Sequence, residues 1–222
     1  MKQLTCILLL CCAAAFPQVA DKANEAYKTK EGRAQMAKTL GDPERSERQR
    51  PRDIVDAMAL KPGSSVADVG TGVGFMLPYL SHAVGSGGTV YGEDIQSDFL
   101  DKARTKVNTE KLTNVKFVLG TDRDPKLPAD TLEAVLVLDV YHHFDYPEMM
   151  MGHIRDSLLS DGKLVIVDYY KRPDAMPNGR AMEHIRLDMD DVIKEVEGYG
   201  FKLSLKQELI PKTQYLAIFV KK

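Results

Sequence analysis

Cysteine is scarce in this sequence. The 222 residues contain three cysteines, and all of them (Cys6, Cys11 and Cys12) lie in the first dozen positions. They fall inside an apolar run, residues 4–16, that follows a short basic start and ends in small residues. This order is typical of a signal peptide, and the run is too short to span a bilayer comfortably. We therefore expect a leader over residues 1–20, the alternative being a buried N-terminal helix.

Loss of such a leader has two consequences. The remaining chain would contain no cysteine, which excludes a disulfide, a cysteine-based metal site and a cysteine nucleophile. The protein would be exported, to the periplasm or beyond the cell, with no stable membrane insertion after cleavage. Without cleavage, we expect it in the cytoplasm.

The sequence also lacks an excess of charge. Its 30 Lys and Arg residues nearly balance 32 Asp and Glu residues, and the formal net charge is −2. A chain of this kind has no general attraction for nucleic acid or an anionic membrane, so we expect no nucleic-acid partner. Recognition must then come from a local site. No internal repeat or low-complexity tract is present, and nothing indicates an oligomeric state.

Apolar segments with strand and helix character alternate after residue 50. Residues 21–50 read as a helical extension with a charge-rich connection at 41–51, and residues 51–222 as one domain. Alternation of this kind predicts an α/β fold with a mainly parallel sheet, whose ligand crevice lies beyond the carboxyl ends of the strands. The expected strands are residues 65–69, 89–94, 115–119, 132–139, 163–169, 201–209 and 215–220. The expected helices are residues 52–60, 75–84, 97–107 (with Ser97 as N-cap), 147–159 and 190–199, with a turn at 161–162.

A glycine-rich loop follows the first expected strand, in the sequence DVGTGVG at residues 68–74. A dinucleotide site requires G-x-G-x-x-G, whereas here the third glycine comes one residue early. Asp68 would repel a pyrophosphate but would attract a sulfonium or an ammonium group. The second strand ends in Glu93 and Asp94, and Asp94 at the strand exit is the better acceptor for ribose hydroxyls. Its alternative role is that of an acid at the start of the following helix.

These motifs resemble the class I S-adenosylmethionine-dependent methyltransferases over nearly all of the chain after residue 51. The matching stretches are VADVGTGVG at 66–74, VYGEDIQ around Asp94, LEAVLVLDVYHHF at 132–144 and LLSDGKLVIVDY at 158–169. The chain resembles an exported, bacterial-type member with the motif DVYHHF. The resemblance implies a Rossmann-like seven-stranded, mostly parallel sheet of order 3-2-1-4-5-7-6, with the last strand antiparallel and helices on both faces. It also implies S-adenosyl-L-methionine as cofactor and S-adenosyl-L-homocysteine as product.

The resemblance further implies a set of cofactor-binding residues. They come from the glycine loop, the tip of the second strand, the turn after the third strand and the end of the fourth: Asp68, Gly70, Thr71, Gly72, Gly74, Asp94, Ile95, Thr121, Asp122 and Asp139. Many members place an acid directly after the third strand, against the adenine amine. The turn is longer here, and Asp122 is the expected adenine contact, with Thr121 beside it.

The motif DVYHHF supplies the candidate catalytic residues Tyr141, His142 and His143. Methyl transfer depends mainly on alignment of the nucleophile and removal of water, and it needs a base only if the nucleophile carries a proton. Either histidine could be that base, although a structural or packing role is the commoner one for a titratable residue in a cleft. Tyr169, Arg172 and His184 are the candidates for the acceptor pocket.

Two further features leave alternatives open. Two or three histidines with Asp168 or Glu183 could bind a metal, but their spacing is not diagnostic and we expect no metal. The arginines at positions 45, 48 and 50 read as a solvated charge run, although one of them could cap the cofactor's carboxylate.

The expected activity is methyl transfer from S-adenosylmethionine (EC 2.1.1.-) to a small-molecule acceptor, on oxygen, nitrogen or sulfur. An Asn-Pro-Pro-Tyr motif for flipped bases is absent, as is a cysteine nucleophile in the mature chain. A second hypothesis is a catalytically weak protein that binds S-adenosylmethionine or S-adenosylhomocysteine. Export favours it, because the cofactor is made in the cytosol. A third is an NAD(P)-dependent oxidoreductase, which the early third glycine and the lack of a Tyr-x-x-x-Lys pair disfavour.

The leader generates the first testable prediction. Expression of the full chain in a bacterium with a secretory pathway should give a mature protein that starts after Ala15 or Ala20, of which Ala15 fits the small-x-small rule better because Gln18 lies three residues from the second site. Intact-mass measurement of the purified protein would detect either product. Recovery of the uncleaved chain alone would argue against a leader.

Overall fold

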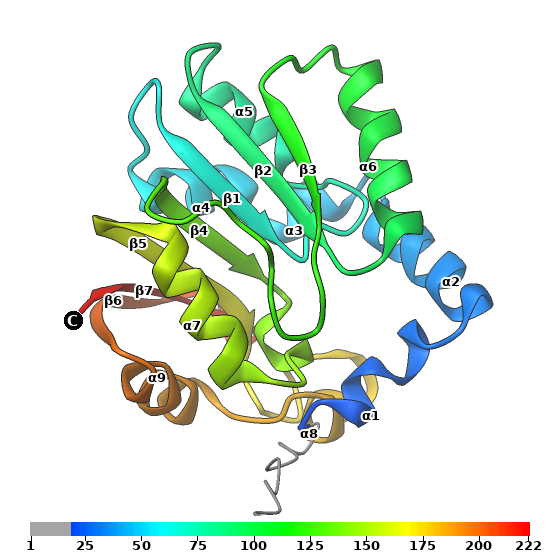
Figure 1. Ribbon diagram of the computed structural model, residues 1–222. Helices are drawn as coiled ribbons and strands as arrows, with labels where there is room; N and C mark the ends of the chain where they lie inside the picture. The colour runs from blue at the N-terminus through cyan, green and yellow to red at the C-terminus, as the bar shows by residue number, and fades with distance from the viewer. Residues whose placement is uncertain (1–18) are drawn as a thin grey trace, which may run out of the picture.

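The computed structural model describes residues 19–222, so the expected leader lies outside the described residues except for Val19 and Ala20. The core is one seven-stranded sheet of order β3-β2-β1-β4-β5-β7-β6 (Figure 1). β7 runs antiparallel to β5 and β6, and the other neighbours are parallel. This confirms the predicted fold. The strands are β1 (Ser65–Val69), β2 (Thr89–Asp94), β3 (Val115–Leu119), β4 (Leu132–Leu138), β5 (Leu158–Tyr169), β6 (Phe201–Ile210) and β7 (Gln214–Lys221).

Helices cover both faces of the sheet (Figure 1). The α-helices are α1 (Asp21–Asn24), α2 (Lys30–Leu40), α3 (Arg45–Gln49), α4 (Pro51–Met58), α5 (Leu77–Val84), α6 (Ser97–Thr109), α7 (Pro147–Ser157), α8 (Ala181–His184) and α9 (Met189–Gly198). Three short 3-10 helices are η1 (Glu25–Tyr27), η2 (Tyr141–His143) and η3 (Pro177–Gly179).

The central strand β4 is buried on both faces, as its continuous apolar sequence predicts. Leu136 packs in one cluster of buried residues with α4, α5 and α6. Its neighbours Val135 and Val137 point to the opposite face and pack with α7 and α9. The alternation arises because successive side chains of a strand point to opposite faces. The sheet therefore lies between two hydrophobic clusters, and each of its faces packs in one of them.

Three local expectations are wrong. β5 begins at Leu158 rather than at residue 163, because Leu158 already pairs with Leu132 of β4. The stretch expected as a turn at 161–162 lies within β5, where the pairing with β4 shifts in register. Ser97 is the first residue of α6, not its N-cap; the N-cap Gln96 instead donates its backbone N–H to a carboxylate oxygen of Asp94, at 2.8 Å. The connection expected at 41–51 contains the helix α3.

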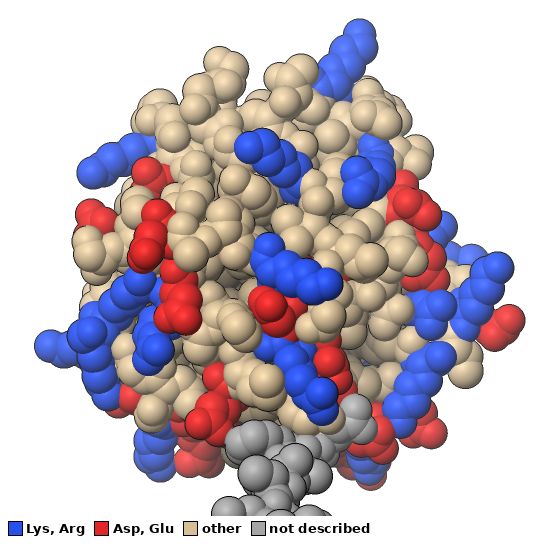
Figure 2. Space-filling view, in the orientation of Figure 1, with Lys and Arg blue, Asp and Glu red and all other residues tan. Residues whose placement is uncertain are grey.

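The surface carries charges of both signs. On the face shown in Figure 2, Lys and Arg side chains are interspersed with Asp and Glu side chains and do not gather into one basic groove. Within residues 19–222, none of the helices is long and apolar enough to cross a membrane.

The two-layer core predicts the effect of a matched pair of substitutions. Leu136→Ala should lower the free energy of unfolding by about 2–5 kcal/mol, because the leucine is fully buried and its loss leaves a cavity. Leu205→Ala in β6 makes the same chemical change at a side chain that is 42% exposed, and should cost less than about 1 kcal/mol. Urea unfolding followed by circular dichroism measures both. Equal losses would contradict the placement of β4 at the centre.

Candidate functional site

A cavity of about 290 Å³ opens at the carboxyl ends of β1, β2 and β4. This position follows from the topology, because parallel strands present their carboxyl ends at the same edge of the sheet. All of the expected cofactor residues line it except Gly74: Asp68, Gly70, Thr71, Gly72, Asp94, Ile95, Thr121, Asp122 and Asp139. Gly74 has a packing role instead. A Cβ atom there would lie 3.0 Å from a methyl carbon of Leu77 and 3.1 Å from Cβ of Ala103.

The loop between β1 and α5 needs its glycines for conformation and close approach. Gly70 has φ +70°, and a Cβ atom there would lie 2.5 Å from a methyl carbon of Val140. Side chains and backbone of the two neighbouring strands hold the loop. The Thr71 hydroxyl donates to Asp68 at 2.6 Å, and the backbone N–H of Gly72 donates to Asp94 at 2.8 Å. The carboxylates that face the cavity therefore also fix the shape of the loop.

Both acids at the end of β2 line the cavity, but they differ in their hydrogen bonds. Asp94 faces the cavity and accepts from Gly72 and Gln96. Glu93 is 1% exposed and lies beneath the loop, where one oxygen accepts from the backbone N–H of Gly70 at 3.2 Å. Its other oxygen has no hydrogen-bond partner. Burial raises the pKa of Glu93 well above its ordinary value, followed in importance by the neighbouring Asp94.

Three of the carboxylates that line the cavity are buried expected cofactor residues with raised pKa values. Burial raises the pKa of Asp68 to about 7, and it raises the pKa of Asp94 and that of Asp139 to about 6 each. A buried carboxylate is costly unless a cation or hydrogen bonds offset the loss of water. The lining therefore favours a ligand that brings positive charge into the cavity.

Arg45 lines the cavity, whereas the sequence left open which of the arginines at 45, 48 and 50, if any, would reach the cofactor. Its guanidinium lies 3.2 Å from Asp139 and 4.4 Å from the centre of the Phe75 ring, and the side chain is only 14% exposed. Asp139 also accepts from the Gln214 amide at 2.6 Å, and Gln214 accepts from Gln49 at 2.7 Å. This chain of polar contacts joins α3 and β7 to the end of β4.

The N-terminal helices form one wall of the cavity. Asn24, Tyr27 and Leu40 line it, although none of them belongs to a recognisable motif. The Tyr27 ring packs edge-on against His143, with ring centres 5.0 Å apart, and lies 6.0 Å from Phe99. Burial raises the pKa of Tyr27 to about 12. The segment expected as a separate extension, residues 21–50, thus shares the cavity with the sheet.

The expected catalytic residues lie in η2, and the structure separates them. His143 lines the cavity, and burial lowers its pKa well below the ordinary value, as do His142 and His184 beside it. His142 is buried behind it, with Nδ1 2.7 Å from Asp168. Tyr141 lies in the hydrophobic core, 1% exposed, and donates its hydroxyl to Glu195 at 2.7 Å. Tyr141 does not line the cavity, and nothing in its contacts supports a catalytic role.

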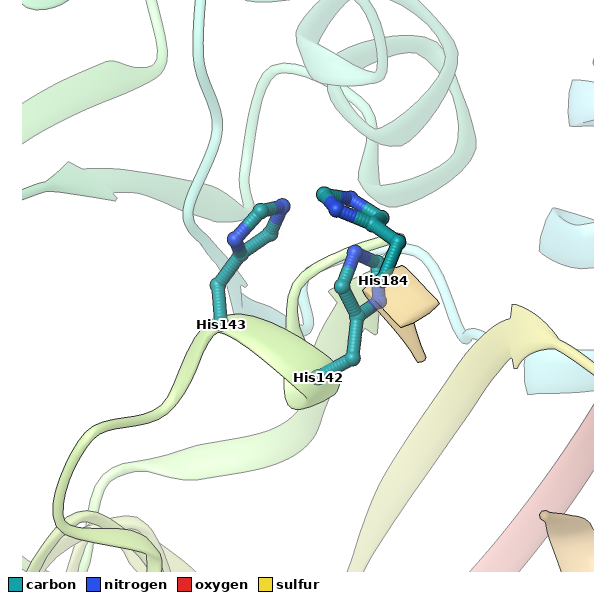
Figure 3. A group of neighbouring side chains, drawn as sticks. All are labelled: His142, His143 and His184. Atoms are coloured by element: carbon teal, nitrogen blue, oxygen red, sulfur yellow. The ribbon is translucent and has the colours of Figure 1, made fainter. Parts of the chain in front are cut away.

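The three residues expected at the acceptor also lie outside the cavity lining. His184, in α8, stands beside His142 and His143 (Figure 3). Burial lowers the pKa of His184 to about 4. Tyr169 lies near Asp139, whose negative charge is the main cause of a raised pKa at the tyrosine. The Arg172 guanidinium stacks over the Tyr170 ring at 4.0 Å.

Several known proteins with similar sequences or structures are methyltransferases. Residues 67–166 match a family model described as a methyltransferase domain. A solved S-adenosylmethionine-dependent methyltransferase from Aquifex aeolicus has 28% sequence identity and a TM-score of 0.77, covering 85% of this chain and 98% of that one. A phosphatidylethanolamine N-methyltransferase from Cereibacter sphaeroides is 31% identical over 111 residues, which are 50% of this chain and 53% of that protein. A nocamycin O-methyltransferase from Saccharothrix syringae is 33% identical over 84 residues, 38% of this chain and 30% of that protein.

The chain thus spans about half, or less, of the length of these curated relatives. In sheet order, in the domain matched over residues 67–166 and in overall structure, the chain is similar to S-adenosylmethionine-dependent methyltransferases. These similarities support S-adenosylmethionine as the cofactor. The residues present fit that group, because the cavity has acidic groups for its positive charges and glycine backbone for close approach.

The raised pKa values predict how cofactor binding depends on pH. A cation binds the ionised form of Asp68, Asp94 and Asp139, whose pKa values are about 7, 6 and 6 in the free protein. Binding of S-adenosylmethionine should therefore release protons, and its affinity should rise as the pH increases from about 5 to about 7.5. Isothermal titration calorimetry in two buffers of different ionisation enthalpy counts the protons released.

S-adenosylhomocysteine is the matched control ligand, because it lacks the sulfonium charge but keeps the ammonium group. Its affinity should change less steeply over the same pH range. Proton uptake on binding of S-adenosylmethionine, or identical pH profiles for the two ligands, would contradict the electrostatic interpretation of the cavity.

Proposed function

We propose that this protein transfers the methyl group of S-adenosylmethionine to a small-molecule acceptor, on an oxygen, nitrogen or sulfur atom. The observation that carries the proposal is the convergence of Asp68, Asp94 and Asp139 with the glycine loop on one cavity. A dinucleotide would bring pyrophosphate charge to the same acids and would be repelled. The cavity chemistry thus argues for methyl transfer and against the oxidoreductase hypothesis.

The proposed cofactor contacts follow from charge and position. Asp94, at the end of β2, accepts hydrogen bonds from the ribose hydroxyls. Asp68 and Asp139 face the positively charged amino-acid end, and Arg45 receives its carboxylate. Thr121 and Asp122 lie on the adenine side, after β3. In this arrangement Arg45 and the three acids match a ligand that carries both a carboxylate and positive groups.

The proposed mechanism depends on alignment and exclusion of water. When bound, S-adenosylmethionine supplies a methyl group on a positively charged sulfur, and its transfer leaves neutral S-adenosylhomocysteine. Next to the end of β4, the cavity is lined by Phe144, Val140 and His143. Their side chains would exclude water from the methyl group. His143 has a lowered pKa, so its ring is neutral at pH 7 and a weak base. It is therefore suited to orienting an acceptor by hydrogen bonding more than to removing a strongly held proton.

Several observations favour a small acceptor. The two curated relatives carry names of an N-methyltransferase and an O-methyltransferase that act on phosphatidylethanolamine and nocamycin. On the face in Figure 2, basic side chains are interspersed with acidic ones, an arrangement unsuited to a long polyanion.

We further propose export of the chain, on the leader pattern of residues 1–20 alone.

Asp94→Asn tests the cofactor assignment. The amide keeps an acceptor oxygen for Gly72 but removes the charge and one of the acceptors for ribose. We expect binding of S-adenosylmethionine to weaken by about 1.5–3 kcal/mol, which is roughly 10- to 150-fold in Kd. Calorimetric titration of S-adenosylmethionine into both proteins measures the change.

Asp101→Asn is the matched control, because Asp101 is exposed on α6 outside the cavity. It should bind the cofactor like the native protein.

Titration of NADH into the native protein completes the test. Tight binding of NADH with no binding of S-adenosylhomocysteine would overturn the proposed function. Cofactor turnover with thiols, phenols, amines and metalloid oxyanions then distinguishes an enzyme from a binding protein that lacks catalysis.

A further inference from the structure

Three of the five histidines of this chain lie together at the edge of the cofactor cavity. His142 and His143 come from η2, and His184 comes from α8, so two distant parts of the sequence meet here (Figure 3). The ring centres are 4.1 Å apart for the first two, and 4.9 and 5.3 Å from them to His184. One nitrogen from each ring lies within 4.8 Å of the other two.

Two of these rings are already oriented by an acceptor on their other side. Nδ1 of His142 lies 2.7 Å from the Asp168 carboxylate, which also accepts the backbone N–H of His142 at 3.1 Å. Nδ1 of His143 lies 2.8 Å from the amide oxygen of Asn24. The amide nitrogen of Asn24 donates to the backbone oxygen of His143, which fixes the amide with its oxygen toward the ring.

Because both partners of Nδ1 are oxygen acceptors, the proton of each neutral ring lies on Nδ1. The lone pair is then on Nε2, on the side away from Asp168 and Asn24. A carboxylate or amide oxygen that holds the second nitrogen of a histidine is the common arrangement behind metal-binding histidines. Hydrogen bonding within this cluster therefore prepares Nε2 atoms as ligands.

We propose that His142, His143 and His184 form a binding site for a divalent transition metal, with zinc as the matched ion. Imidazole nitrogen suits zinc, and three protein ligands with an open fourth position are typical of zinc sites that bind an exchangeable ligand. Asp168 and Asn24 support the first two ligands from behind. The sequence left a histidine metal site as the lesser alternative, because the spacing of these residues is not diagnostic of a metal.

The geometry needs only a small closure. Tetrahedral zinc with bonds of about 2.0–2.1 Å holds its nitrogen ligands about 3.3 Å apart. The three nitrogens lie within 4.8 Å of one another, so each nitrogen–nitrogen distance has to shorten by about 1.5 Å at most. His184 can supply this movement by rotation, since it is half-buried at the end of a four-residue helix.

The site adjoins the cofactor cavity through His143, which belongs to both. The fourth coordination position of the zinc can therefore bind the nucleophilic atom of the methyl acceptor, a role that rests on the proposed function. Coordination to zinc lowers the pKa of a bound water or thiol strongly, so the acceptor's proton passes to solvent before transfer. The acceptor's electron pair then forms the bond to the methyl carbon, and the pair of the broken carbon–sulfur bond returns to the cofactor sulfur.

The experiment measures zinc binding directly. Tag-free protein is freed of metal with a chelator and dialysed against known Zn²⁺ concentrations, and bound zinc is counted by atomic emission. We expect one zinc per native chain. His184→Ala should weaken binding at least 100-fold through loss of one of three ligands. Asn24→Ala, which keeps all three ligands but frees the ring of His143, should weaken it roughly 10-fold.

His82→Ala is the matched control, because His82 is exposed and distant from the cluster. It should bind zinc like the native protein. Native protein that takes up less than one zinc per chain, or His184→Ala protein that matches it in affinity, would overturn the proposal. Thermal melting of each metal-free variant identifies any loss of folding.

Titration with S-adenosylhomocysteine in the absence of zinc keeps this proposal separate from the proposed function. His184 does not line the cavity, so the His184→Ala protein should retain the ligand. Zinc binding without binding of S-adenosylhomocysteine would reject the proposed function and leave the metal site standing. The opposite result would reject the metal site alone.

Discussion

The cavity depends on carboxylates that are held away from water. Parallel strands bring Asp68, Asp94 and Asp139 to one edge of the sheet, where each is 15% exposed or less. Leaving them ionised in a dry site is costly, and their raised pKa values express that cost. Backbone donors of the glycine loop and one arginine offset part of it. A cationic ligand supplies the rest, so the same constraint both shapes the loop and selects the cofactor.

The arginine that offsets this charge is held by parts of the chain outside the glycine-loop region. Arg45 comes from α3, and its partner Asp139 is held by Gln214 of β7, which in turn contacts Gln49. Asp139 also has φ +56°, a left-handed conformation that turns the chain out of β4 toward η2. The antiparallel strand at the end of the chain thus helps to set the direction in which the histidine segment leaves the sheet.

The sequence predicted those features that are local or that topology dictates. Alternating strands and helices fixed the sheet, and the loop with Asp68 and Asp94 fixed where the cavity lies. Tyr27 was not predicted, and Arg45 could not be singled out from Arg48 and Arg50, because their positions depend on helices that fold back across the cavity from a segment without a motif. Tyr141 directly precedes two histidines in the sequence, yet its ring enters the core while the rings of His142 and His143 lie together. The meeting of His184 with η2 likewise depends on tertiary packing that spacing does not encode.

The N-terminal wall also bears on the order in which the molecule is built. Asn24 contacts His143 across 119 positions of sequence. During synthesis, this contact cannot form until the fourth strand and the turn after it have left the ribosome, although Tyr27 and Arg33 can already meet Phe99 and Asp98 of α6. Contacts between such distant residues form late, because closing a long loop costs chain entropy before any contact compensates for it. The sheet can assemble first, and the pocket is completed when residues 21–40 pack over it.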